Sequence, residues 1–322
     1  MATNNETQSG IKTVLIIGAV FPATPIIRTL DNANLAIHVA HPRALSDPYK
    51  QVTYHECETS GAALKTLLSE IKPDLIVSTV SGGAYDTQKA LIDAALEAGV
   101  PRFIPYEFGQ DSLNAGVQER LQPSRGRGKV IEYLKSLSGD GGGSSSKLSW
   151  VGIATGVDLD RGLLNGNLGF DIKWQSATLH GQGSERFAAS SSSWIGRVVL
   201  AVIQHWDAVA NRYLYAAGLT TSGDEVVAAL EKATGQEFVA SKGDVKDCVR
   251  EAEARIERGF PDAGMFLMRR SVMYDEEIGA VRAFEQEDAK KTLGLEAEKL
   301  EDIIDFVNHE FAHHQQGGCG CD

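Results

Sequence analysis

The sequence lacks any apolar run long enough to cross a membrane. The longest such run, Thr13 to Ala23, is about half of the roughly 20 residues that a spanning helix needs. Basic residues are also in the minority, with 31 Lys and Arg against 43 Asp and Glu and a net charge of −12. We therefore expect neither a membrane nor a nucleic acid as partner. Residues 1–10 are polar and show no signal-peptide core, so we expect a loose leader and a cytoplasmic location.

Cysteine is scarce, and the motifs of several enzyme classes are missing. Of the four cysteines, Cys57 and Cys248 stand alone, while Cys319 and Cys321 lie in a glycine-rich stretch that we expect to be a flexible tail over residues 315–322. No disulfide framework is expected. A G-x-S-x-G elbow and a G-x-x-x-x-G-K-S/T phosphate loop are both absent, which leaves acyl transfer and P-loop chemistry without support.

One segment has the spacing of a zinc site. His309 and His313 flank Glu310 in an H-E-x-x-H pattern on a predicted helix. A third ligand is not assured downstream, and both histidines end a charged helix, where they suit the helix dipole. We therefore expect no metal site.

The chain has the composition of a globular protein with a substantial core, at 43% hydrophobic and 23% charged residues. Over residues 11–155 short apolar runs alternate with helical patterns, which predicts an α/β, Rossmann-like, doubly wound parallel sheet. The predicted strands are Thr13–Ile17, Leu35–Ala40, Val52–His55, Leu75–Thr79, Phe103–Ile104 and Trp150–Ile153. The predicted helices are Pro22–Leu30, Ala62–Ile71, Tyr85–Ala98 and Gly128–Leu137, and residues 138–147 are predicted to form a flexible loop.

After Thr155 the pattern loosens. We expect a smaller α+β, substrate-covering domain over residues 156–314, with some elements able to return to the first domain. It would cover the carboxyl ends of the strands, where open α/β sheets bind ligands. Its predicted helices are Ser193–Trp206, Asp224–Thr234, Val245–Arg258 and Glu296–Ala312, and its β-like pieces are Ala177–His180 and Tyr213–Ala216.

The turn after the first strand resembles a dinucleotide-binding turn that has lost glycines. In the G-x-x-G-x-x-G spacing only Gly18 remains, and Phe21 and Thr24 replace the other two. In the G-x-G-x-x-G/A spacing Val20 and Ala23 take those places. Either way a side chain lies where a phosphate would approach the helix N-terminus. Two interpretations stay open: a tolerated variant that still binds NADPH, or a plug formed by Phe21.

Three segments carry a family resemblance: Val77–Val80, Gln88–Ala95 and Gly99–Gly109. With them the chain resembles the isoflavone-reductase-like, NmrA-like branch of the atypical short-chain dehydrogenases, and most of all its fungal members, which often serve secondary metabolism. The similarity continues at residues 155–156, 168–171, 177–178, 211–213 and 228–235, and so spans residues 11–312. It implies NADPH binding and the reduction of aromatic or phenylpropanoid-like small molecules.

The resemblance also places the family's functional positions on this chain. The arginine for the ribose phosphate falls on His41, with Arg43 two residues later, and the catalytic lysine falls on Arg127. Lys129 takes that place if the helix begins one turn differently. At the position before the Glu-Phe-Gly motif, where the family has a serine, this chain has Tyr106. The resemblance thus implies cofactor contacts at Gly18, Phe21, Thr24, His41, Arg43, Thr79 and Val80.

These replacements change the available chemistry. A guanidinium such as that of Arg127 stays protonated at neutral pH, so it can stabilise an oxyanion but cannot exchange a proton. The phenol of Tyr106, at the end of a predicted strand, can donate a hydrogen bond or act as a weak acid. A surface arginine and a packed aromatic residue are the alternatives. We predict substrate contacts at Glu107, Phe108, Asp158, Asp160, Arg161 and His180. For the charged residues among them, the alternative is a structural role in holding a loop or a solvent-exposed position.

The sequence therefore predicts a small-molecule enzyme, acting as a monomer or homodimer. We expect a redox-neutral isomerase or cyclase that needs no cofactor and acts on an aromatic or polycyclic carbonyl compound, because the phosphate turn and the lysine position have changed together. An NADPH-dependent reductase and a non-catalytic dinucleotide sensor are the alternatives.

Overall fold

The computed structural model describes residues 10–19, 21–43, 49, 51–80, 82–138 and 148–316. The expectations for the leader, for most of the loop after residue 138, for Val20 and for the tail with its two cysteines lie outside these residues. None of the helices in the described ranges is long and apolar enough to span a bilayer.

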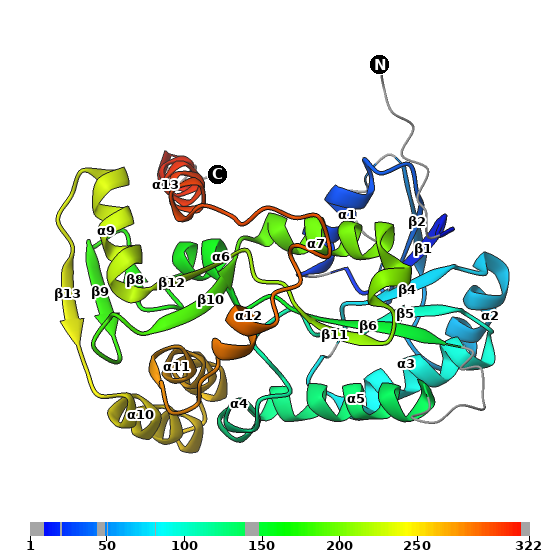
Figure 1. Ribbon diagram of the computed structural model, residues 1–322, viewed down its shortest axis with the longest axis horizontal. Coiled ribbons are helices and arrows are strands. Elements are labelled where there is room, and N and C mark those ends of the chain that lie inside the picture. Colours follow the sequence, from blue (N-terminus) through cyan, green and yellow to red (C-terminus); the bar gives the residue numbers. More distant parts are fainter. Residues whose placement is uncertain are drawn as a thin grey trace, which may run out of the picture.

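A seven-stranded parallel sheet in the order β11-β6-β5-β4-β1-β2-β3 forms the larger part of the molecule (Figure 1). This order confirms the predicted Rossmann-like fold. Its strands are β1 (Thr13–Ile17), β2 (Ala36–His41), β3 (Val52–Glu56), β4 (Leu75–Ser78), β5 (Arg102–Ile104), β6 (Ser149–Ala154) and β11 (Arg212–Tyr215).

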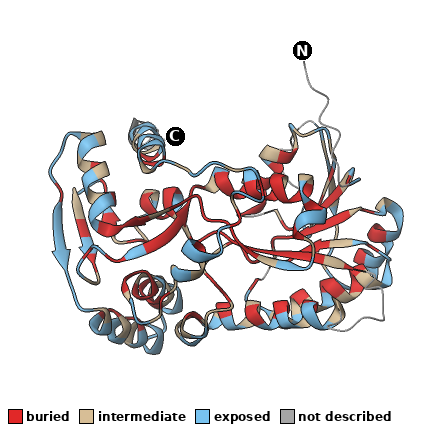
Figure 2. Ribbon diagram, viewed as in Figure 1, coloured by how far each residue is buried: buried red, intermediate tan, exposed pale blue. Residues whose placement is uncertain are grey.

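Helices cover both faces of this sheet, and alternate residues of β1 show why. Val14 and Ile16 face the core under α1 (Ala23–Leu30) and α7 (Ser192–Gln204). Leu15 and Ile17 face the other core, under the helices α2 (Gly61–Ile71), α3 (Tyr85–Glu97) and α5 (Gln122–Ser138). From Val14 to Ile17 the strand is therefore apolar and buried on both sides (Figure 2).

A smaller part with two three-stranded sheets lies beyond the carboxyl ends of the large sheet (Figure 1). Its strands are β7 (Val157–Asp158), β8 (Phe170–Asp171), β9 (Ser176–Leu179), β10 (Arg186–Ser190), β12 (Leu219–Ser222) and β13 (Val239–Lys242). The remaining helices are α4 (Ala115–Arg120), α6 (Leu159–Leu164), α8 (Trp206–Val209), α9 (Gly223–Thr234), α10 (Val245–Glu257), α11 (Pro261–Tyr274), α12 (Arg282–Gln286) and α13 (Leu300–Gln316).

Elements that follow residue 155 return to the larger part of the molecule. Strand β11, expected as a β-like piece of the smaller domain, pairs in parallel with β6 at the edge of the large sheet. Helix α7 packs against α1, where Gly196 allows the close approach: a Cβ there would collide with the Thr29 side chain and the Pro25 carbonyl. The chain therefore crosses into the smaller part and returns.

Helix α5 begins earlier than predicted, at Gln122 instead of Gly128. Pro123 lies in its first turn, where a proline costs no hydrogen bond. Arg127 and Lys129 consequently both lie well inside the helix. At about 100° per residue, they point about 200° apart around its axis.

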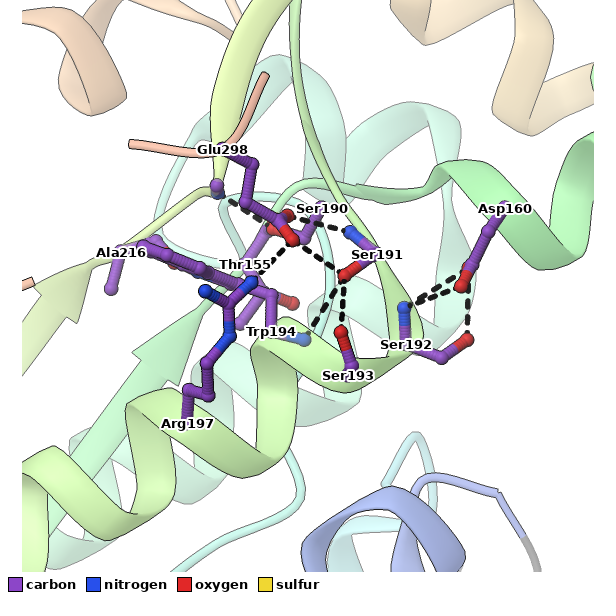
Figure 3. A network of polar contacts seen from close by, with 11 residues as sticks. Thr155, Asp160, Ser190, Ser191, Ser192, Ser193, Trp194, Arg197, Ala216 and Glu298 are labelled. Carbon is purple, nitrogen blue, oxygen red and sulfur yellow. Dashed lines mark hydrogen bonds and ion pairs between the residues drawn. The ribbon is translucent and has the colours of Figure 1, made fainter. Parts of the chain in front are cut away.

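A run of four serines joins β10 to α7, and a buried glutamate holds it (Figure 3). The Glu298 carboxylate accepts hydrogen bonds from the Ser191 backbone N–H at 2.9 Å and from its hydroxyl at 2.6 Å. The same carboxylate pairs with Arg197 at 2.6 Å. Because Ser191 also accepts from the Trp194 N–H, this network caps α7 and fixes where the chain passes between the two parts.

A substitution at Gly18 would test how tightly the end of β1 is packed. Its φ is +107°, and a Cβ there would lie 2.5 Å from Thr79 Oγ1. Gly99 also has a positive φ, +72°, but nothing lies near its missing Cβ. We expect Gly18→Ala to lower the free energy of unfolding by roughly 1–3 kcal/mol more than Gly99→Ala, because only the first adds overpacking to backbone strain. Equal losses in urea denaturation would contradict this account.

Candidate functional site

A cavity of about 500 Å³ opens between the carboxyl ends of the large sheet and the smaller part. This volume suits a drug-sized molecule. Its lining comes from both parts. From the first come Phe21, Tyr106, Phe108 and Arg127, and from the second come Asp158, Arg161, Phe266 and Arg269. The structure thus brings together five residues predicted as catalytic or substrate-binding.

Tyr106 and Arg127 lie side by side in this cavity. The Arg127 guanidinium carbon is 5.2 Å from the centroid of the Tyr106 ring. Gly82 packs against the same ring, since a Cβ on it would approach a ring carbon to 2.6 Å. The phenol is therefore held in place by backbone on one side, with a cation near its ring.

Lys129 is not part of this arrangement. Its side chain is exposed, and it does not line the cavity, because α5 turns it away from Arg127. The described lining of the cavity contains no lysine. Arginine therefore occupies the position that the family resemblance assigns to lysine, and no neighbouring lysine replaces it.

Glu107, predicted to contact substrate, is instead fully buried outside the cavity lining. One carboxylate oxygen accepts from the Ser112 hydroxyl at 2.6 Å and from the Tyr213 hydroxyl at 3.3 Å, and the other has no partner. Burial raises the pKa of Glu107 to about 7, against the lowering effects of the Arg127 charge and these hydrogen bonds. Its role is to hold the loop, and its charge state is coupled to Arg127.

The two aspartates at the start of α6 have different environments. Asp160 accepts from the Ser192 N–H at 3.0 Å and from the Arg161 N–H at 2.8 Å, so it ties down the ends of two helices and lies outside the lining. Asp158 lines the cavity and shares the Ser192 hydroxyl with Asp160. Burial and the neighbouring Asp160 charge raise the pKa of Asp158. Asp158 is therefore suited to proton transfer near neutral pH.

Phe21 reaches from the turn before α1 into the cavity. Its ring centroid lies 4.4 Å from the guanidinium carbon of Arg161, on α6 of the smaller part. This contact bridges the two parts at the N-terminal end of α1. The ring therefore lies next to the place where a Rossmann fold holds a diphosphate.

At the end of β1, Gly18 and Thr79 are held by hydrogen bonds to neighbouring strands, but the start of α1 has fewer backbone N–H donors. Gly18 donates to the Ala40 carbonyl at 2.9 Å, and the Thr79 hydroxyl donates to the Ile17 carbonyl at 3.0 Å. In the first turn of α1, however, Pro22 and Pro25 have no N–H to offer a phosphate. The sequence analysis did not consider the missing N–H of Pro25.

The predicted contacts to the ribose phosphate, after β2, are His41 and Arg43. His41 Nδ1 accepts from the Arg43 N–H at 3.1 Å, so the imidazole is used within the turn, and the Arg43 side chain is exposed. Thr24 is exposed, and Val80 packs near Gly18. Among the residues that the structure describes, Pro22, Pro25 and Phe21 leave few backbone donors for a diphosphate at the turn before α1.

Three histidines considered in the sequence analysis lie outside this cavity. His180 is outside the cavity lining, with its ring 6.3 Å from that of Tyr274. His309 and His313 lie on exposed positions of α13 with their Nε2 atoms 3.0 Å apart. Within the part of the chain that the structure describes, no three histidine, cysteine or acidic residues are grouped to hold a metal ion.

Helix α11 contributes lining residues that sequence reasoning missed. No helix was predicted over Pro261–Tyr274, so Phe266 and Arg269 were not considered. The Arg269 guanidinium lies 5.9 Å from the Phe266 ring centroid. No motif marks these residues, and only the fold places them opposite Tyr106 and Arg127.

The buried carboxyl of Glu107 gives a prediction for stability against pH. Its folded pKa is raised from 4.5 to about 7, so the unfolded chain releases this proton first as pH rises. Stability is therefore lost across that window, by roughly 3 kcal/mol. We expect Glu107→Gln to remove this part of the pH dependence in denaturant titrations, while Glu119→Gln, at an exposed position of α4, leaves it intact. An unchanged pH profile in Glu107→Gln would contradict the assignment.

Comparisons of the sequence with curated proteins find relatives that are named as oxidoreductases. The oxidoreductase aprR of Aspergillus flavus is 34% identical over 209 residues, which cover 65% of this chain and 68% of the relative. The oxidoreductase poxI of Penicillium oxalicum is 27% identical over 239 residues, covering 72% of this chain and 73% of the relative. No family model matches the chain.

Solved structures share the same architecture at low sequence identity. A leucoanthocyanidin reductase–NADPH complex from Vitis vinifera has a TM-score of 0.70 at 17% identity, covering 92% of this chain and 99% of that one. AtPrR2 with NADP⁺ and (+)pinoresinol has a TM-score of 0.71 at 16% identity, with the same coverage. An isoflavone reductase has a TM-score of 0.70 at 14% identity, covering 93% and 99%.

Proposed function

We propose a redox-neutral small-molecule reaction for this chain, which belongs to the isoflavone-reductase-like, NmrA-like family of the atypical short-chain dehydrogenases. The reaction is an isomerisation or cyclisation of an aromatic or polycyclic carbonyl compound in secondary metabolism. Its partner is a small molecule and its location the cytoplasm. The names of the fungal relatives support an enzyme on this scaffold.

The observation that carries the proposal is the contact of Phe21 with Arg161. It lies near the N-terminus of α1, where Pro22 and Pro25 have no backbone N–H to donate. A cofactor diphosphate has little to bind there. The cavity beyond still presents acid–base and oxyanion-binding groups, so its chemistry fits a reaction without electron transfer.

The cavity residues provide a complete proton-transfer step. The Asp158 carboxylate takes a proton from the carbon next to a substrate carbonyl, and the C–H electron pair forms a C=C bond as the carbonyl oxygen becomes an enolate. Arg127 and Tyr106 stabilise that oxygen by charge and hydrogen bonding. The protonated Asp158 then returns the proton to a different carbon, so no electrons leave the substrate.

This step predicts the effect of removing the base. Asp158→Asn should lower kcat by about 10²–10⁴-fold, the usual contribution of a general base. Tyr106→Phe should cause a smaller loss, because the oxygen keeps Arg127. Conversion of a panel of polycyclic ketones to products of unchanged mass, followed by mass spectrometry, measures both. Asp305→Asn, at an exposed position of α13, is the control. Full activity in Asp158→Asn would remove Asp158 from the mechanism.

The raised pKa of Asp158 sets the pH dependence of the same reaction. The base form grows only as pH rises past the usual range of an aspartate, so kcat should increase with pH toward neutrality. A rate already at its plateau at pH 5 would contradict Asp158 as the base.

An NADPH-dependent reductase is the second candidate, favoured by the oxidoreductase names of the relatives and by the intact packing of Gly18 and Thr79. Calorimetry with NADPH separates the two. We expect no saturable binding up to about 1 mM, a free energy weaker than about −4 kcal/mol. The double variant Phe21→Gly with Pro25→Ala should bind more tightly. Saturable binding with substrate-dependent loss of the NADPH absorbance would establish the reductase.

A further inference from the structure

We propose that the substrate of this cavity is an aromatic or polycyclic carboxylate, held by three arginines that each lie against an aromatic ring. The inference rests on the proposed function only in taking the cavity as the substrate site. It adds the charge and shape of the molecule that enters.

The charge of the cavity is opposite to that of the protein. The whole chain carries a net charge of −12, yet Arg127, Arg161 and Arg269 all line this one space. Among the residues that the structure describes, two carboxylates line it with them, those of Asp158 and Asp262. Because the surrounding protein is acidic, three cations converging on one cavity mark a place where a negative group binds.

These arginines are unpaired. In the residues that the structure describes, no carboxylate oxygen lies within 4.0 Å of their guanidinium nitrogens. The Nε atom of Arg127 is buried and has no hydrogen-bond partner at all. By contrast, Arg120 pairs with Asp275 at 2.9 Å and Arg197 with Glu298 at 2.6 Å. This buried donor of Arg127 costs free energy while it is unpaired, and a bound carboxylate would recover that cost, whereas Arg161 and Arg269 are exposed and would bring their charge to the same ligand.

Each of the three guanidinium groups lies near an aromatic ring of the same cavity. Arg127 is 5.2 Å from the Tyr106 centroid and Arg161 is 4.4 Å from that of Phe21. Arg269 is 5.9 Å from the centroid of Phe266. A guanidinium that lies near a ring can still donate its N–H groups to a planar carboxylate. The rings provide apolar surface for the rest of the ligand, so the lining suits a flat, ring-bearing acid.

The arginines are close enough to disturb one another. Burial, followed by the charges of Arg127 and then Arg161, lowers the pKa of Arg269, while Tyr106 and Asp158 act in the opposite direction. Like charges held this close repel, and an anion between them relieves the repulsion. The cavity volume of about 500 Å³ limits that anion to a single small molecule.

Calorimetry on the full chain tests the inference with 2-naphthoate and its neutral isostere 2-naphthamide. We expect naphthoate to bind at least about 10-fold more tightly, since charge-assisted hydrogen bonds to arginine are the stronger kind. Arg161→Gln and Arg269→Gln should each weaken naphthoate roughly 5–30-fold and leave naphthamide within about 2-fold. Arg250→Gln, on the exposed face of α10, removes the same charge outside the cavity and should change neither ligand.

Several outcomes would overturn the inference. Equal affinity for naphthoate and naphthamide would do so, as would no binding of naphthoate, or an equal loss in Arg250→Gln. Far-ultraviolet circular dichroism confirms that each variant is folded. The result is independent of the reaction type: a chain that binds NADPH yet prefers naphthoate would lose the redox-neutral proposal and keep this one.

Discussion

The contact between the Phe21 ring and the Arg161 guanidinium determines how the two parts of this molecule share one cavity. Phe21 comes from the turn that begins α1, and Arg161 from the first helix of the smaller part. A cation on an aromatic face contributes about 0.5–2 kcal/mol, depending on how dry the site is. Both side chains line the same cavity as Tyr106, Arg127 and Asp158.

The surrounding structure fixes this geometry. The Ser191–Glu298 network caps α7 (Figure 3), and α7 packs against α1, whose first turn carries the two prolines. Asp160 ties Ser192 to α6, which sets the position of Arg161 one residue later. Glu107 and its partners hold the loop after β5 under Arg127. Groups that bind or move charge in the cavity therefore depend on polar contacts just outside it.

Much of the fold could be predicted from the sequence, because most of the strands from β1 to β6 are short apolar runs and helical patterns separate most of them. That topology also predicted that the site lies at the carboxyl ends of the parallel strands. The predicted start of α5 was wrong because the first turns of this helix are polar and contain glycine, which hides the helical pattern. Strand β11 and helix α7 were assigned to the smaller part because pattern alone does not show where a chain returns.

The composition of the site was harder to predict. Tyr106, Arg127 and Phe21 were found because they depart from a family pattern, whereas Phe266 and Arg269 belong to no motif and reach the cavity only through the fold. Glu107, Asp160 and His180 were expected to contact substrate, and burial or distance removes them from the lining. The most direct test of the central claim is a crystal structure grown with excess NADPH. The account predicts the Phe21 ring still beside Arg161, with no diphosphate at the Ala23 and Thr24 amides. An ordered dinucleotide there, with Phe21 displaced, would contradict it.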